Sequence, residues 1–148
     1  MNTQSQPTAD SAFFQLPKEM LPEVWPVVAP GIQAAVDRAA GRMSMENIAN
    51  YIMGGKWQLW LFLKNKEYKA LAITEITVCP SGMKILNLVV CTGEDKELWE
   101  VLIPSTLEHF ARIEGCKLFE TMARPGWEKI LGRQGFKKTH VLLEKELN

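Results

Sequence analysis

Three β-rich segments that follow one another with only short turns between them constrain the fold of this chain more than any other feature. They span residues 57–63, 70–79 and 85–91, and turn-forming residues separate them at 65–67 and 80–82. Turns this short can join only antiparallel neighbours. The first and third segments are apolar on both faces, which is typical of strands inside a sheet. The sequence therefore predicts an antiparallel meander at the centre of the sheet.

A change in the apolar period follows the meander. After Cys91 the period changes from 2 to 3.6 residues, which predicts a long helix that Pro104 bends and Gly115 ends. Residues 118–122 then predict another strand. Because a strand, a helix and a strand form a crossover unit, segments 85–91 and 118–122 should be parallel neighbours.

The last part of the chain repeats this alternation on a smaller scale. Pro125 can open a short helix, and Gly135 can close it. The residues from Phe136 to Leu147 predict a final strand.

The N-terminal part predicts a tail and an edge strand. Residues 1–11 are polar and predict a flexible tail, whereas residues 12–148 predict a single domain. The apolar stretch at 12–16 predicts a short strand at the edge of the sheet.

Two helices are predicted between this edge strand and the meander. Apolar residues fall at helical spacing from Leu21 to Ala39, but Pro26 and Pro30 predict that this helix is broken or kinked. Ser44 predicts the cap of a second helix. The complete predicted order is β-α-α-β-β-β-α-β-α-β, an α/β fold with a mixed sheet.

Charge and cysteine content narrow the classes of partner and location. Lysine plus arginine and aspartate plus glutamate both number 17 in the 148 residues, so no broad attraction to nucleic acid or to an anionic membrane is expected. Near-zero net charge favours self-association or assembly with other proteins. Three unpaired cysteines and two isolated histidines predict neither a disulfide framework nor a metal site. With no apolar run long enough to span a bilayer, the cytoplasm is the expected location.

The stretch from Gly115 to Phe136 resembles the C-terminal half of the GNAT acyltransferase family. It carries a helix ending in glycine, a strand, a short helix and a closing Gly-Phe pair. The helix start Arg124-Pro125-Gly126-Trp127, with Leu59-Trp60-Leu61 upstream, is similar to a divergent bacteriophage branch. Some members of that branch resemble virion-morphogenesis or internal virion proteins rather than enzymes. The resemblance implies a GNAT-like acyl-CoA N-acyltransferase fold, with acetyl-CoA as cofactor if the chain is an enzyme.

A GNAT enzyme holds the coenzyme A pyrophosphate on a glycine-rich loop of the form Q/R-x-x-G-x-G/A before the long helix. The resemblance assigns this role to Val90, Cys91, Thr92 and Gly93, but only one glycine is present, and three acids follow it at 94, 95 and 97. These acids suit the helix dipole and repel a pyrophosphate. A like-charge contact at about 4 Å costs roughly 1 kcal/mol in water and about 4 kcal/mol at an effective dielectric of 20. The sequence therefore predicts a degenerate cofactor loop.

The remaining chemistry of the family is only partly represented. Many members place a tyrosine four residues before the Gly-Phe pair as general acid, and Leu131 stands there in this chain. Glu75 is a candidate base, or a residue on the solvent face of its strand. Cys91 is a candidate nucleophile, or a buried structural thiol.

Basic and aromatic residues around the short helix are candidates for binding. Arg124, Trp127 and Arg133 could hold a phosphate or an acidic partner, or form part of a solvated basic face. Five tryptophans are many for this length, and any exposed one would mark a protein contact.

Three functions follow as hypotheses. The first is a structural or protein-binding component of a virion or its assembly, made in the host cytoplasm, with a degenerate acyl-CoA site and no cofactor. The second is an active acetyl-CoA-dependent N-acyltransferase with an atypical loop. The third is a phage inhibitor that binds a host protein.

Overall fold

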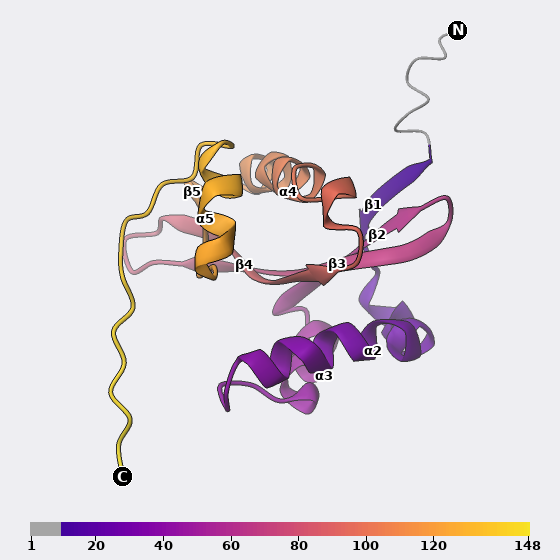
Figure 1. Cartoon of the computed structure of the whole chain (residues 1–148), viewed down its shortest axis with the longest axis horizontal. Coiled ribbons are helices and arrows are strands. Elements are labelled where there is room, and N and C mark those ends of the chain that lie inside the picture. The colour runs from indigo at the N-terminus through magenta and orange to yellow at the C-terminus, as the bar shows by residue number, and fades with distance from the viewer. Residues whose placement is uncertain (1–9) are drawn as a thin grey trace, which may run out of the picture.

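One mixed sheet lies between two layers of helices (Figure 1). A computed structural model describes residues 10–148, so most of the tail predicted for residues 1–11 lies outside the described residues. The strands lie in sequence order across the sheet: β1 (Ser11–Gln15), β2 (Trp57–Lys64), β3 (Glu67–Val78), β4 (Lys84–Gly93) and β5 (Leu118–Thr121).

The strand pairing confirms the predicted meander and crossover. Each of β1, β2 and β3 pairs antiparallel with the next strand, whereas β4 and β5 are parallel. The connection between the parallel strands carries the 3-10 turn η3 (Lys96–Leu98) and the helix α4 (Leu102–Ile113). The predicted edge strand is β1.

Helices cover both faces of the sheet. The turn η2 (Lys18–Met20) leads into α2 (Leu21–Arg38), which packs with α3 (Met45–Met53) on one face. Helix α4 and the short α5 (Pro125–Gly132) lie on the other. Within residues 10–148, no helix has the length and apolar character needed to cross a membrane.

Each face has its own hydrophobic core because successive side chains of a strand point to opposite faces. Leu71 and Ile73 of β3 pack with α2 and α3, whereas Ala70 and Ala72 of the same strand pack with α4. Burial of these faces, and not helix propensity alone, holds the helices in place.

The prolines disturb the helices less than expected. Helix α2 is continuous from Leu21 to Arg38, so the prediction of a broken helix is wrong. Pro26 and Pro30 are exposed, whereas Val28 and Ile32 between and beyond them are buried, so the missing N–H donors fall on the solvent side. Pro104 does not lie inside a long helix, because α4 begins only at Leu102 and has the proline in its first turn, where the N–H would lack an intrahelical partner.

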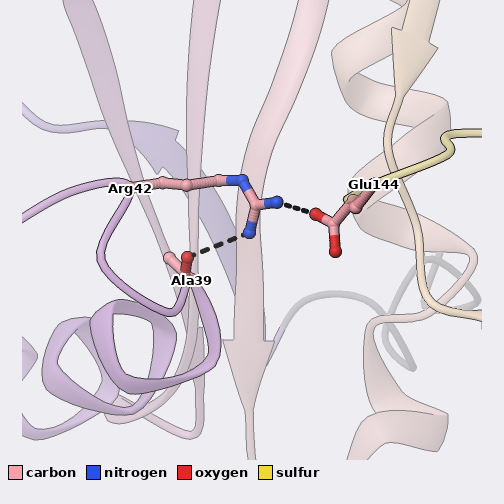
Figure 2. Close-up of polar contacts among 3 residues, drawn as sticks. All are labelled: Ala39, Arg42 and Glu144. Carbon is pink, nitrogen blue, oxygen red and sulfur yellow. Dashed lines mark hydrogen bonds and ion pairs between the residues drawn. The ribbon is translucent and has the colours of Figure 1, made fainter. Parts of the chain in front are cut away.

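The predicted final strand at residues 136–147 is wrong. The chain there is neither helix nor strand, and it runs away from the sheet (Figure 1). Phe136 still packs on Phe119 of β5, with ring centroids 5.1 Å apart. Beyond it, Glu144 forms an ion pair with Arg42 of the α2–α3 connection (Figure 2). A strand needs a hydrogen-bonded neighbour, and this segment has none among residues 10–148.

Candidate functional site

The two parallel strands diverge where the family would place its cofactor. Pairing between β4 and β5 stops at Leu88 and Thr121, whereas β4 continues to Gly93. The divergence coincides with a bulge, because Thr74 of β3 pairs with Leu88 and Ile73 pairs with Val90. Val89 is therefore the extra residue of β4, and a bulge of this kind bends its strand away from its neighbour.

The candidate residues Val90, Cys91, Thr92 and Gly93 form the end of β4 beyond this bulge. All four pair with β3, in a continuous register from Ile73 to Ala70. The four residues therefore lie together at the end of β4, where it diverges from β5. They form a regular strand and not a loop that could surround an anion.

Gly93 has a packing role that is unrelated to phosphate binding. A Cβ atom at this position would lie 2.4 Å from both the Cβ of Ala70 and the carbonyl oxygen of Lys69. The next residue continues the pairing, because the N–H of Glu94 donates to the carbonyl of Lys69 at 2.8 Å. The close approach of β4 to β3 therefore requires glycine at this position. The Glu94 N–H already donates to a backbone carbonyl and is not available to a phosphate.

The acidic residues after Gly93 are held by local contacts. Asp95 adopts a left-handed conformation with φ of 54°, and its carboxylate lies 3.1 Å from the ammonium of Lys69. The hydrogen bond to Asp95, with the charge of this carboxylate, raises the pKa of Lys69. Lys69 thus neutralises a protein carboxylate and is not free to bind a phosphate.

Trp99 closes the turn from the other side. Its buried indole N–H donates to the carbonyl of Glu94 at 2.7 Å, and its backbone carbonyl accepts from the N–H of Ile103 at 2.9 Å. Its ring lies 6.0 Å from that of Trp127, over which the Lys96 ammonium sits at 4.4 Å.

In the first turn of α4, Pro104 lacks an N–H, and the N–H groups of Ile103 and Ser105 already donate to the carbonyls of Trp99 and Val101, so these three positions offer no donor to an anion. The turn does not fit a pyrophosphate.

Glu75 lies away from this turn. It pairs with Asn87 of β4, before the bulge, so it is roughly 10 Å along the sheet from Val90 at about 3.3 Å per residue. Its side chain is 22% exposed, and its carboxylate lies 3.9 Å from the ammonium of Lys56. The structure thus gives this candidate base a cationic partner on the face that packs with α2 and α3.

The position expected for a general acid has no proton donor. The Leu131 side chain is 5% exposed, and its carbonyl accepts the N–H of Phe136 at 3.1 Å. Sequence reasoning passed over Tyr68, whose hydroxyl points toward Gly31 of α2. Burial, with the charge of Glu94, raises the pKa of Tyr68 to about 12, which makes it a poor acid. No local sequence pattern signals this placement, because it depends on how α2 crosses β3.

Cys91 fits the structural interpretation. It packs against the core beneath α4, and burial raises the pKa of its thiol to about 12. A thiol that stays protonated at neutral pH is a weak nucleophile.

Arg124 and Arg133 do not form a common cluster. They flank the eight-residue helix α5 at its opposite ends, roughly 13 Å apart at 1.5 Å per residue, and both are exposed. Trp127 is partly buried against Trp99. Among the tryptophans, Trp60 and Trp99 are buried and the other three are partly buried, so none is the exposed contact that the sequence left open.

Two pockets lie on the face of the sheet that packs with α2 and α3. One, of about 300 Å³, is lined by residues such as Lys18, Trp57 and Gln58. The other, of about 450 Å³, is mostly apolar and reaches Tyr68. Neither is lined by the end of β4.

Comparison with known proteins identifies the fold. No family model and no curated protein matches the sequence. Among solved structures, an aminoglycoside acetyltransferase from an uncultured soil metagenomic sample, in complex with sisomicin, superposes with a TM-score of 0.68 at 10% identity, over 95% of this chain and 98% of that one. A predicted acetyltransferase from Clostridium acetobutylicum, solved with acetyl-CoA, gives 0.65 at 12% identity, over 92% and 96%. Glucosamine-6-phosphate N-acetyltransferase from Arabidopsis thaliana gives 0.60 at 11% identity, over 93% and 99%.

These likenesses confirm the predicted GNAT-like fold. At such low identity they establish the arrangement of strands and helices alone, and the chemistry must be argued from the residues of this chain.

Proposed function

We propose that this chain is a GNAT-fold protein with a degenerate acyl-CoA site, and that it acts by binding other proteins. The observation that carries the proposal is the turn from Gly93 to Trp99, where Gly93, the Glu94 N–H and the neighbouring Lys69 all serve internal contacts. The apolar Leu131 at the acid position supports the same conclusion.

Calorimetric titration with coenzyme A and acetyl-CoA tests this proposal. We expect no binding heat at millimolar ligand, because the turn offers acids where a pyrophosphate needs donors. The matched control replaces Arg124 and Arg133 by alanine, which removes the exposed basic groups at the ends of α5. Micromolar binding that persists in this control would overturn the proposal.

An active N-acyltransferase with an atypical loop is the second candidate. The divergence of β4 from β5 favours it, because the two strands stop pairing after Leu88 and Thr121 even though the glycine-rich loop is absent. In this case Glu75→Gln should abolish acyl transfer to an amine while acetyl-CoA still binds. Binding without any turnover in the wild-type chain would count against it.

The resemblance to bacteriophage proteins supports a more specific role for the degenerate protein. We place it in a virion or in its assembly, within the host cytoplasm. Mass spectrometry of particles purified through a density gradient should then recover the chain, and neighbouring genes should encode portal, capsid or tail proteins. A host-directed inhibitor would instead be absent from particles and would bind a host protein.

A further inference from the structure

An apolar pocket of about 450 Å³ lies where β1, the β2–β3 hairpin and the start of α2 meet. Its walls include Phe14, Met20 and Val27, whose side chains are 37%, 41% and 51% exposed. Exposed apolar side chains that gather around a hollow indicate a binding site, whereas scattered ones are ordinary. The end of β4 does not line this pocket, which is therefore separate from the degenerate acyl-CoA site.

A bulge in β3 directs Tyr68 into the wall of this pocket. The register of β3 against β2 passes directly from Ala70 to Tyr68, so Lys69 is the extra residue of the bulge. Ala70 and Ala72 face α4, whereas Tyr68, which has the same parity, packs with the core on the α2 side. In a regular strand the Tyr68 ring would face α4, so the bulge supplies a wall that the pocket would otherwise lack.

The turn beside the pocket carries a lysine where glycine would be more stable. Asn65 and Lys66 form the two-residue turn between β2 and β3, and both have positive φ, of 53° and 67°. Such turns favour asparagine followed by glycine, because most side chains are strained at positive φ. Lys66 is the one charged residue in the described lining of the pocket, and no ion pair within residues 10–148 includes it. A lysine placed against local preference, with its charge unpaired, indicates a use outside the fold.

The lining of the pocket determines which chemistry fits it. Apolar walls favour a hydrocarbon body, and an unpaired ammonium favours one negative charge at the end of that body. The described residues that line the pocket include no carboxylate, so nothing there opposes an anion. A peptide would bring several polar backbone groups, for which these walls have few partners. The lining therefore fits a free aliphatic monocarboxylate better than a peptide or a polyanion.

We propose that this pocket binds a free medium-chain aliphatic carboxylate, with the carboxylate on Lys66 and the hydrocarbon chain between β1 and α2. The hydrocarbon would cover Phe14 and Val27, which are exposed in the free protein. Burial of these apolar surfaces drives binding, and the ammonium fixes the orientation of the ligand. The site is independent of whether the chain binds acyl-CoA.

Calorimetric titration of the full chain with octanoate tests the proposal, with octanol as the uncharged counterpart. We expect octanoate to bind at submillimolar concentration and octanol to bind roughly tenfold more weakly, since it lacks the contact with the ammonium. Lys66→Gly should weaken octanoate binding by about the same factor, while its melting temperature without ligand equals or exceeds that of the wild-type chain. Lys66→Arg keeps the charge and should bind octanoate as the wild-type chain does.

A second variant tests the pocket and leaves the turn intact. Val27→Asp places a carboxylate in the wall at an exposed position, so the chain should fold and bind octanoate at least about tenfold more weakly. The matched control is Val101→Asp before α4, where a valine of 59% exposure receives the same charge outside the pocket. This control should bind octanoate as the wild-type chain does, and equal weakening in the two aspartate variants would contradict the proposal.

Amide chemical shifts of the wild-type chain locate the bound octanoate without any variant. We expect the changes to gather at residues 14–27 and 61–68, which carry the walls of the pocket. Changes confined to the exposed apolar residues at 141–147 would overturn the proposal, because they would show adsorption to the C-terminal segment. Absence of binding at millimolar octanoate, or unchanged binding in Lys66→Gly, would overturn it as well.

Discussion

The absence of a side chain at Gly93 decides how closely β4 lies against β3. From sequence alone this glycine is interpreted as the remnant of a phosphate loop, since glycine is the mark of such loops. The structure shows a second reason for glycine that sequence cannot reveal, because the crowding atoms belong to Lys69 and Ala70, more than twenty residues earlier.

Gly93→Ala should therefore destabilise the fold by about 1–3 kcal/mol, the usual cost of forcing atoms into a packed site. The matched control is Gly126→Ala in α5, where no atom lies within 4 Å of the new methyl group. It should be neutral or stabilising by up to about 1 kcal/mol through helix propensity. Urea unfolding of both variants measures the difference, and equal stabilities would contradict the steric argument.

The Cys91 thiol and the Tyr68 hydroxyl make the free energy of unfolding depend on pH in the alkaline range. Burial raises the pKa of Cys91 to about 12, and burial with the charge of Glu94 raises that of Tyr68 to about 12. The unfolded chain loses these protons near their ordinary pKa values of about 8.5 and 10, while the folded chain keeps them. The contribution is thus fully present below about pH 8.5, and it is lost as pH rises toward 12.

Urea unfolding between pH 8 and pH 11 should show this loss, with a slope of at most about 1.4 kcal/mol per pH unit from each group. Cys91→Ala should make the slope shallower. Val90→Ala, beside Cys91 in β4, removes buried volume but no titrating group, so it is the comparison and should leave the slope unchanged. An identical slope in Cys91→Ala would show that its thiol does not titrate differently on unfolding.

At the scale of single elements, local signals predict more than long-range ones. The cap of α3 is an example, because Ser44 accepts the N–H of Asn47 at 3.1 Å and the Asn47 side chain accepts the N–H of Ser44 at 3.2 Å. All partners lie within four residues, so the sequence suffices to predict the start of this helix. The effect of Pro26 and Pro30 cannot be predicted locally, because it depends on which side of α2 faces solvent.

Ser44→Ala should cost about 1 kcal/mol, because it leaves an N–H of the first turn without an acceptor. Ser44→Asp keeps an acceptor and should retain nearly full stability. Thermal unfolding followed by circular dichroism distinguishes the two. An alanine variant as stable as the aspartate variant would mean that the cap contributes little.

At the scale of the whole molecule, the sheet joins the two cores. Phe62 of β2 is fully buried on the α4 side, and Leu61 beside it is buried on the α2 side. Loss of either helix layer would expose one face of strands whose other face packs against the remaining layer. The molecule should therefore unfold in one transition.

Two substitutions test this coupling, Phe62→Ala in one core and Ile48→Ala in the other. Each should lower stability by about 2–5 kcal/mol. In each variant the tryptophan fluorescence and the circular dichroism should change at the same urea concentration. Separate transitions would show that the cores are independent.

Short-range patterns in the sequence predict the centre of the sheet, whereas the fate of the C-terminal segment depends on the rest of the molecule. The meander, the crossover and the parallel β4–β5 pair follow from residue patterns and short connections within the chain. The segment after Phe136 has an equally good strand pattern, but a strand forms only where an edge receives it. The pattern of apolar residues indicates which side chains favour burial. It does not indicate which strand edge lies close enough to pair with the segment.

The extra residue Val89 reverses the parity of β4. Before it, the even-numbered Leu86 and Leu88 face α4, whereas after it the odd-numbered Cys91 faces α4 and Val90 faces α2. If Val89 were instead paired in a regular strand without the bulge, a single alternation would run along β4, and Val90 and Cys91 would each face the wrong layer. The divergence of β4 from β5 therefore coincides with the bulge that lets one strand supply side chains to two cores, so folding alone is a sufficient reason for it, whether or not a ligand binds there.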